Sequence, residues 1–281
     1  MDEVSWMTGL WLDDKVVVEG QGCGWMTGLW LRPEWSDCGA RRVLWFIMDD
    51  MLVVGVCRGR IQRDKGLGRF DLDRNTKELL GRQAEGETFF VQGEFWVDPR
   101  RSILKAYEKT DQAILSNSSD LGRGGSTAVT AILINGRRLW IANVGDSRAL
   151  LSQGGRTMQM STDHEPRAER SSIEDRGGFV SNLPGDVPRV NGQLAVSRAF
   201  GDKGLKTHLS SEPDIRDAYV DNQTDVLVLA SDGIWKVMSN EEAMEIARRV
   251  KDPQKAAKEL TAEALRRESK DDISCVVVRF R

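Results

Sequence analysis

The sequence predicts an α+β fold in which helices cover antiparallel sheets. Three observations support this class. Residues 126–144 read as a β-hairpin, because two apolar strands flank Asn135-Gly136, a pair that favours a tight turn. Helices with N-terminal capping signals follow Ser239, and a valine-rich strand at 273–280 closes the chain. Strand pairs, a long irregular middle and helices between strands are together typical of this class.

The N-terminal third offers few recognisable elements. Six of the nine tryptophans lie before residue 46, and WMTGLWL occurs twice, at Trp6–Leu12 and Trp25–Leu31. A solenoid needs roughly three or more copies to bury a continuous core, so two do not predict one. The repeat is either an exposed aromatic patch or a local duplication, and we favour the duplication. Residues 43–56 fit a strand pair or a buried helix.

From about Glu94 onward, the capping signals, apolar spacing and turn residues of the sequence agree with one another, as expected of a chain that folds. Asp98-Pro99 is typical of an N-cap followed by proline at the first helical position, and apolar residues keep a helical stripe to about Leu115. After the hairpin, residues 149–151 extend the meander, and a turn follows at Gln153-Gly154-Gly155.

The two helices near the C-terminus have clear starting points. Ser239 and Glu242 form a capping-box pattern that opens a helix to about Val250. Asp252-Pro253 starts the next helix, whose apolar residues share one face up to Leu265.

Composition and charge exclude several kinds of partner. The formal net charge of −3 over 281 residues gives no reason to expect nucleic acid or an anionic membrane. No apolar run approaches a membrane span, and the acidic start Met1-Asp2-Glu3 argues against a secretory leader. The four cysteines show no C-x-x-C spacing, so neither a zinc site nor a disulfide framework is expected. A reducing compartment, cytoplasmic or nuclear, is the default.

Acidic residues recur where strands meet turns. Asp146 follows LWIANVG, Asp202 follows AVSRAFG, and Asp232 follows the buried strand run VLVLAS. Asp271 and Asp272 directly precede the closing strand. A single aspartate beside a glycine is more often a turn residue, but several at strand ends indicate one rim of oxygen ligands for Mg²⁺ or Mn²⁺. A buried carboxylate such as Asp232 also needs a basic side chain or a bound ion to neutralise it.

Such a rim favours hydrolysis of a phosphate ester, because hard metals acidify bound water and neutralise phosphoryl oxygens. The two histidines, His164 and His208, lie near no nucleophile signature, and His164 is interpreted as a turn or packing residue. Residues 122–127, GRGGST, lack the Lys-Ser/Thr ending of a phosphate-binding loop. A phosphohydrolase with Asp232 as nucleophile would have a second acid two residues later, where Ile234 stands.

The acids belong to a longer series of stretches that carry a family resemblance. The series is GRGGSTAVTAIL, LWIANVGDSRALL, DHEP, IEDRGGFV, RVNGQLAVSRAFGDK, EPDI, LVLASDGIWKVMSNEEA and SKDDISCVVVRF. In order and spacing it resembles the metal-dependent protein phosphatase 2C (PPM) family, and its plant branch most closely. The resemblance implies a β-sandwich of two antiparallel sheets flanked by helices, incomplete at the N-terminus. It also implies removal of phosphate from phosphoserine and phosphothreonine.

The resemblance assigns candidate site residues. It implies that Asp232 and Asp271 are metal ligands, and that Asp146 is a ligand of a third, more weakly held metal. Asp202, Gly233 and Asp272 would support the same rim. The family normally holds two Mn²⁺ or Mg²⁺ ions in this site. Lys236, by contrast, stands where many relatives have an acid, which would change the local field.

The family's N-terminal signatures are absent from this sequence. An Arg-x-x-Met-Glu-Asp stretch and an Asp-Gly-His-Gly stretch would supply a phosphate-binding arginine, the aspartate that bridges the metals and a proton-donating histidine. The nearest acids are Asp49-Asp50 and Asp64, and no histidine precedes Glu94. We therefore divide the chain into residues 1–93, a divergent Trp-rich segment, and residues 94–281, a phosphatase 2C-like domain, and we assign no catalytic residue.

Two functions follow from the resemblance. The first is a protein serine/threonine phosphatase that uses a metal-activated water, with activity reduced or lost through the missing motifs. The alternative is a catalytically inactive relative that binds phosphoproteins or other partners. The expected partners are phosphorylated proteins, without nucleic acid or membrane, and the chain is expected to be a monomer.

Overall fold

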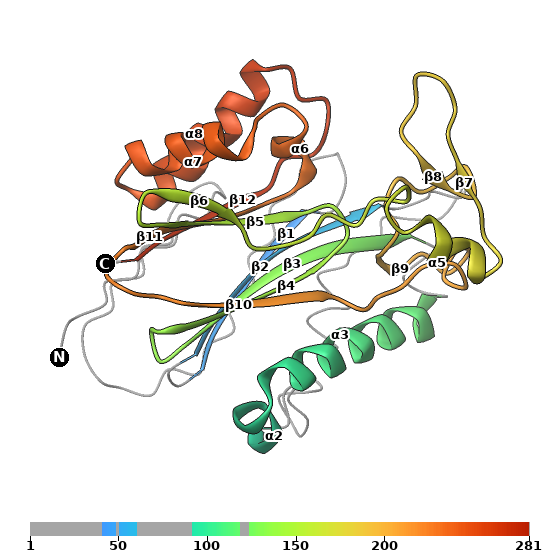
Figure 1. Cartoon of the computed structure of the whole chain (residues 1–281), viewed down its shortest axis with the longest axis horizontal. Helices are drawn as coiled ribbons and strands as arrows, with labels where there is room; N and C mark the ends of the chain where they lie inside the picture. Colours follow the sequence, from blue (N-terminus) through green and yellow to red (C-terminus); the bar gives the residue numbers. More distant parts are fainter. Residues whose placement is uncertain (1–40, 49–50, 61–91, 119–123, 281) are drawn as a thin grey trace.

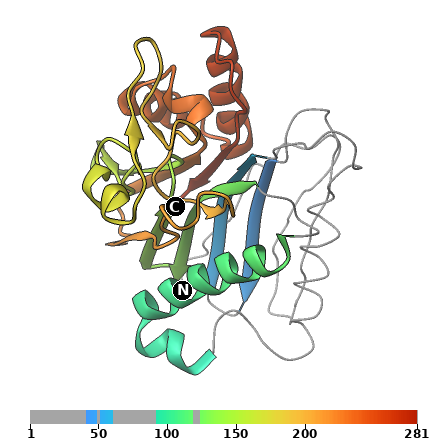
Figure 2. The ribbon, with the colours of Figure 1, turned by 90° about the vertical axis from the view of Figure 1, so that its right-hand side faces the viewer.

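The fold is a sandwich of two antiparallel sheets with helices on both outer sides. The structure, a computed structural model, describes residues 41–48, 51–60, 92–118 and 124–280. Figure 1 shows α2 and α3 on the outer side of one sheet and α6, α7 and α8 on the outer side of the other. Figure 2, turned by 90°, shows the same two helical layers on opposite sides of the strands. The repeated WMTGLWL stretch and the acids Asp49, Asp50 and Asp64 lie outside the described residues.

The first sheet is six-stranded, with the order β1-β2-β3-β4-β10 and β9 paired to β3. Its strands are β1 (Arg41–Met48), β2 (Met51–Arg60), β3 (Gly125–Ile134), β4 (Arg138–Val144), β9 (Phe200–Gly201) and β10 (Asp214–Tyr219). The second sheet has four strands in the order β12-β11-β5-β6. These are β5 (Arg148–Gln153), β6 (Arg156–Gln159), β11 (Thr224–Ala230) and β12 (Cys275–Arg279).

The helices fall into an N-terminal pair, a short helix in the irregular middle and a C-terminal group. They are α2 (Gln92–Val97), α3 (Pro99–Ser116), α5 (Arg170–Asp175), α6 (Asp232–Trp235), α7 (Asn240–Arg249) and α8 (Pro253–Arg266). A two-stranded ribbon of β7 (Val180–Ser181) and β8 (Arg189–Val190) follows α5. No helix among the described residues combines the length and apolarity needed to cross a membrane.

Strand β11 is buried on both faces, which explains its uninterrupted apolar sequence. Leu227 and Leu229 face the first sheet and pack in the core between the sheets with residues such as Ile141. Val226 and Val228 face the opposite way and pack against the layer of α6, α7 and α8. Burying each such side chain stabilises the fold by about 1.5–3 kcal/mol. The two-sided burial confirms the prediction that this run is a buried strand.

Several local predictions are confirmed. The hairpin β3–β4 turns at Asn135 and Gly136, whose φ angles of 51° and 61° are the positive values that a tight hairpin turn requires. Asp98 caps α3, because its side-chain oxygen accepts a hydrogen bond from the Arg101 N–H at 3.0 Å. Residues 43–48 and 51–56 lie in the paired strands β1 and β2, which is the strand-pair alternative.

The first described strands connect the two predicted segments of the chain. Strands β1 and β2 belong to residues 1–93, and β2 pairs along its whole length with β3 of residues 94–281. The described strands of the N-terminal segment therefore belong to the first sheet, while the division at residue 93 stays a prediction. The sequence analysis predicts no helix at Asp232–Trp235, where the structure has the one-turn helix α6.

The capping box of α7 makes the stability of the fold depend on pH in acid. The Glu242 side chain accepts from the Ser239 N–H at 2.8 Å, and this bond, with help from Arg267, lowers the pKa of Glu242 to about 2. Because the pKa is lower in the folded state, the stabilisation is present above about pH 4.5 and is lost as the pH falls toward about 2.

We predict that Glu242→Gln lowers the melting temperature at pH 6 and that its difference from wild type shrinks steadily toward pH 2.5. The measurement is thermal unfolding followed by circular dichroism across this pH range. Glu245→Gln, on the same helix but outside the capping box, is the control. A difference that stays constant from pH 6 to pH 2.5 would contradict the assignment.

Candidate functional site

The pairing of β11 brings three of the predicted acids to one end of the second sheet. Ala230, the last residue of β11, lies opposite Arg148 of β5 and Cys275 of β12. Both partner strands are antiparallel to β11, so they begin where β11 ends. The segment after β11, which contains Asp232, therefore lies beside the segments that precede β5 and β12, which contain Asp146 and Asp271.

Asp232 and Asp271 converge on one cationic nitrogen. Lys236 Nζ lies 2.5 Å from Asp232 Oδ2 and 2.6 Å from Asp271 Oδ2. The Asp232 side chain is only 6% exposed and that of Asp271 is 22% exposed, whereas the Lys236 side chain is 55% exposed. Burial lowers the pKa of Lys236, but its hydrogen bonds to both carboxylates and their negative charge outweigh this, so the net pKa is raised. The buried carboxylate thus has the basic partner that its position demands.

The backbone around this pair is held by close contacts between the SDG and KDD stretches. A Cβ added to Gly233 would lie 2.3 Å from the carbonyl oxygen of Asp272, so only glycine permits this approach. Ser231 Oγ donates to the same carbonyl at 3.0 Å and accepts from the Ser274 N–H at 2.9 Å. Gly233 and Asp272 therefore support the site through their backbone positions, which fix the distance between Asp232 and Asp271.

The turn that carries Asp146 is clamped by His164. Gly145, with φ of 98°, donates its N–H to His164 Nδ1 at 3.1 Å and accepts the His164 N–H at 3.0 Å. His164 is buried, and burial together with the charge of Arg198 lowers its pKa, although the acids Glu169 and Asp214 oppose this. A neutral ring that accepts through Nδ1 fits that direction. The structure therefore gives His164 a positional role, as the sequence analysis expects of a packing histidine.

Asp202 lies on the first sheet at the same end of the sandwich. Gly201, which precedes Asp202, pairs with Gly125 at the start of β3. Three residues further along β3, Ala128 pairs with Val144, the last residue of β4. Asp202 therefore lies at the end of the first sheet from which the chain leaves β4 toward Asp146. A Cβ on Gly125 would lie 2.1 Å from Asp202 Oδ2, so the Asp202 carboxylate packs directly over this glycine. Asp202 itself has a positive φ of 49°.

The described residues contain no set of three or more His, Cys, Asp or Glu side chains placed to hold a metal ion. The converging acids are the pair Asp232 and Asp271, with Asp146 and Asp202 at the same end of the sandwich but outside the pair. The donors of the pair are oxygens, which suit a hard cation, and they already enclose one positive charge. The kind of donor atom that the pair offers, carboxylate oxygen, therefore suits Mn²⁺ or Mg²⁺.

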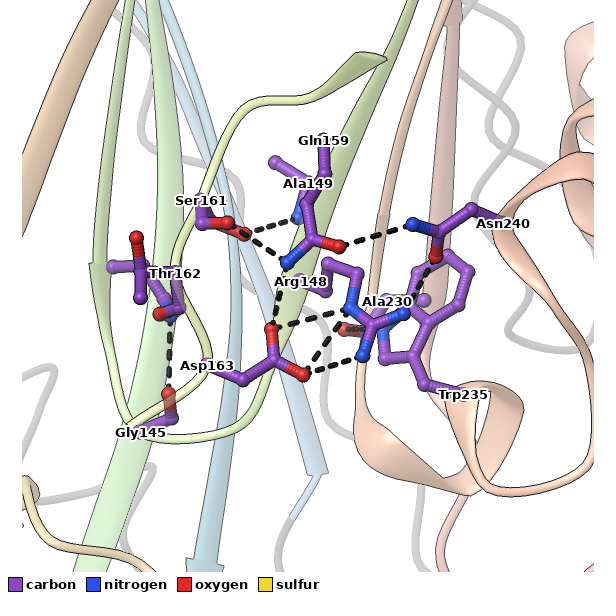
Figure 3. Close-up of polar contacts among 11 residues, drawn as sticks. Gly145, Arg148, Ala149, Gln159, Ser161, Thr162, Asp163, Ala230, Trp235 and Asn240 are labelled. Carbon is purple, nitrogen blue, oxygen red and sulfur yellow. Dashed lines mark hydrogen bonds and ion pairs between the residues drawn. The ribbon is translucent and has the colours of Figure 1, made fainter. Parts of the chain in front are cut away.

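A closed polar network that the sequence analysis did not foresee surrounds Arg148 (Figure 3). The guanidinium donates to both oxygens of Asp163, with the shortest distance 2.5 Å, and to Asn240 Oδ1 at 2.5 Å. Gln159 closes the ring, because its amide donates to Asp163 at 3.2 Å and its oxygen accepts from Asn240 at 3.0 Å. The Arg148 guanidinium carbon also lies 5.2 Å from the centre of the Trp235 ring.

This network joins the segments that carry the acids. Arg148 lies two residues after Asp146, Asp163 directly precedes His164, and Trp235 belongs to the helix that Asp232 begins. Asn240 is the first residue of α7. The partners of Arg148 are separated from it by up to 92 residues, so no local sequence pattern reveals them.

The comparison with known proteins decides the family. The model of the family described as "Protein phosphatase 2C" matches residues 74–273. The chain belongs to the protein phosphatase 2C family. The relatives include "Probable protein phosphatase 2C 9" of Arabidopsis thaliana, 92% identical over 190 residues that make up 68% of each chain. "Probable protein phosphatase 2C 41" of Oryza sativa subsp. japonica is 72% identical over 188 residues, 67% of this chain and 66% of the relative.

Solved structures support the same fold. The phosphatase 2C described as "serine-threonine phosphatase 2C from Toxoplasma gondii" has a TM-score of 0.68 and 25% identity, over 88% of this chain and 92% of that one. "Structure of a C.elegans sex determining protein" also reaches 0.68, at 22% identity over 85% of this chain and 60% of that one, which supports the fold alone. The predicted family, fold and function as a serine/threonine phosphatase of this family are thus confirmed. The inactive binding module is not favoured.

We predict that Arg148 and Asp163 are strongly coupled, because their side chains are only 20% and 17% exposed and share several hydrogen bonds. In a double-mutant cycle of Arg148→Met and Asp163→Asn, we expect a coupling of about 1–3 kcal/mol in the free energy of unfolding. Urea denaturation provides the measurement.

The matched control is the pair Arg170 and Glu174, which lie 3.1 Å apart with side chains 45% and 47% exposed. Exposed pairs of this spacing typically couple by about 0.3–0.5 kcal/mol. Equal coupling in the two cycles would show that the Arg148 network contributes no more than a surface ion pair.

Proposed function

We propose that this chain hydrolyses phosphoserine and phosphothreonine in phosphorylated proteins, with Mn²⁺ or Mg²⁺ held at the edge formed by Asp232 and Asp271. The single observation that carries the proposal is the convergence of these two carboxylates on one positive charge, at 2.5 and 2.6 Å. Membership of the protein phosphatase 2C family, whose members depend on metals, supports it independently.

The bound metal would supply a water acidic enough to attack phosphorus and would neutralise the phosphoryl oxygens. Asp232 and Asp271 would hold the ion through their carboxylate oxygens. Two protein carboxylates suit a hard cation that keeps several of its own waters. Asp146 would hold a further, weaker ion from the same end of the sandwich, and Asp202 and Asp272 would add negative charge near it.

Other residues of the chain would position these acids. Gly233 and Ser231 fix the segment that carries Asp232 against the one that carries Asp271. His164 holds the turn at Gly145 in front of Asp146. The Arg148 network anchors the same turn and α6 to α7, so the acids are presented on a rigid support.

Because the sequence lacks the Asp-Gly-His-Gly stretch, we further propose that the chain binds its metals weakly and turns over slowly. Loss of a supporting residue around a metal already costs about 10- to 100-fold in affinity or activity, and a missing ligand costs more. We also propose that the protein acts as a monomer in the cytoplasm or the nucleus, in line with its cysteine pattern and its modest net charge.

We predict that hydrolysis of a phosphothreonine peptide requires added Mn²⁺ and is abolished by EDTA. Asp232→Asn removes one negative ligand of the pair, so we expect activity at a fixed Mn²⁺ concentration to fall by at least about 100-fold. Release of inorganic phosphate is measured across a series of Mn²⁺ concentrations.

Asp217→Asn is the control, since Asp217 lies on β10 in an exposed ion pair with Arg138, 3.5 Å away. Its activity should equal that of the wild type. Equal activity of Asp232→Asn and wild type would refute the proposed metal edge, and turnover no higher than that of denatured protein would refute the proposed activity.

A further inference from the structure

Lys236 occupies the place between the two acids that a bound cation needs. Its Nζ contacts Oδ2 of Asp232 and Oδ2 of Asp271 at 2.5 and 2.6 Å. Two independent features of the fold produce this position. Lys236 directly follows the one-turn helix α6, four residues after Asp232, and the pairing of β11 with β12 brings Asp271 to the same point.

A divalent cation and the lysine ammonium compete for the same oxygens. Mg²⁺ contacts its oxygen ligands at about 2.0–2.1 Å, so its ligands cannot keep an ammonium between them as well. Their positive charges also repel each other, most strongly next to a carboxylate that is as little exposed as that of Asp232. Binding of a metal to this pair therefore requires the ammonium to leave.

The side chain of Lys236 is suited to leaving. It is more than half exposed, although the carboxylate of Asp232 beside it is buried. A lysine has a long flexible stem and a strongly hydrated head, so the ammonium can rotate into solvent without any movement of the backbone. The acids, by contrast, are held in place by the backbone contacts of Gly233 and Ser231.

We propose that Lys236 is a built-in competitor of the metal, which neutralises Asp232 and Asp271 in the metal-free protein and is displaced when a divalent cation binds. This inference rests on the proposed metal edge. It assigns to Lys236 two effects of opposite sign. The ammonium stabilises the metal-free fold, because an uncompensated buried carboxylate is costly, and it weakens metal binding, because it must first be expelled.

The test combines two measurements on Lys236→Met, which keeps most of the unbranched side chain and removes its charge. Calorimetric titration with Mn²⁺ should give a dissociation constant about tenfold lower than that of wild type, within the usual range for coupled sites. Thermal unfolding of the metal-free variant should occur at a lower temperature than in wild type. Lys236→Arg, which keeps the charge, should restore both values toward wild type.

Arg267→Met is the matched control, because Arg267 also bridges two carboxylates, Glu242 and Glu263, each at 2.8 Å. It should destabilise the metal-free protein without strengthening Mn²⁺ binding. If Lys236 is only a structural ion pair, Lys236→Met will behave in the same way as this control, and the proposal is then wrong. If wild type and all variants are folded but none binds Mn²⁺, the metal edge itself fails, and the competitor role fails with it.

A measurement on the wild type avoids any dependence on how the variants fold. Acetylation of lysines by a water-soluble ester, followed by mass spectrometry, reports how readily each lysine side chain is released into solvent, where it can react as the neutral amine. Addition of Mg²⁺ should speed the labelling of Lys236 several-fold and leave exposed Lys255 unchanged. Labelling of Lys236 that does not respond to Mg²⁺ at concentrations that support binding would show that the ammonium is not displaced.

Discussion

The pairing of β11 with β5 and β12 is the constraint on which the candidate site depends. Leu227 and Leu229 fill the core between the sheets while Val226 and Val228 pack under the helices, so both faces of the strand are buried. A slip of one residue would exchange these two sets between environments that are already closely packed. Burial of ordinary aliphatic side chains therefore fixes the register, and the register fixes the acids beyond Ala230 at one end of the sheet.

Charge compensation is the second requirement, and near the candidate site the protein meets it by pairing the charged groups within local networks. The Arg148 guanidinium is satisfied by Asp163 and Asn240 and covers the Trp235 ring. Asp232 and Asp271 are satisfied by Lys236. The difference lies in exposure: Arg148 is largely enclosed, whereas Lys236 reaches the acids from solvent. An enclosed cation acts as permanent structure, and one that enters from solvent can exchange with another cation.

Local chemistry in the sequence predicts much of this fold but not its side-chain networks. The turn at Asn135-Gly136 and the cap at Asp98 follow from backbone preferences within a few residues, and both are found as expected. The meeting of Asp232 and Asp271 could be anticipated because both stand at the ends of strands. The sequence also marks Lys236 as an unusual charge, but its contact with two acids depends on strand register. Arg148 and its distant partners leave no periodic signal at all, since their pairing exists only in three dimensions.

The first sheet shows why the missing N-terminal signatures matter physically. Strand β2 pairs with β3 as far as Arg60 opposite Gly125, the residue that also pairs with Gly201 beside Asp202. The end of β2 thus reaches the same end of the sandwich as the acids, yet its sequence, MLVVGVCRGR, contains no carboxylate. A family member with an Asp-Gly-His-Gly stretch would supply a bridging aspartate, and nothing in β2 replaces it. Among the described residues, the two carboxylates that converge on one positive charge at this end are Asp232 and Asp271, which makes the pair held by Lys236 the strongest place there for a cation.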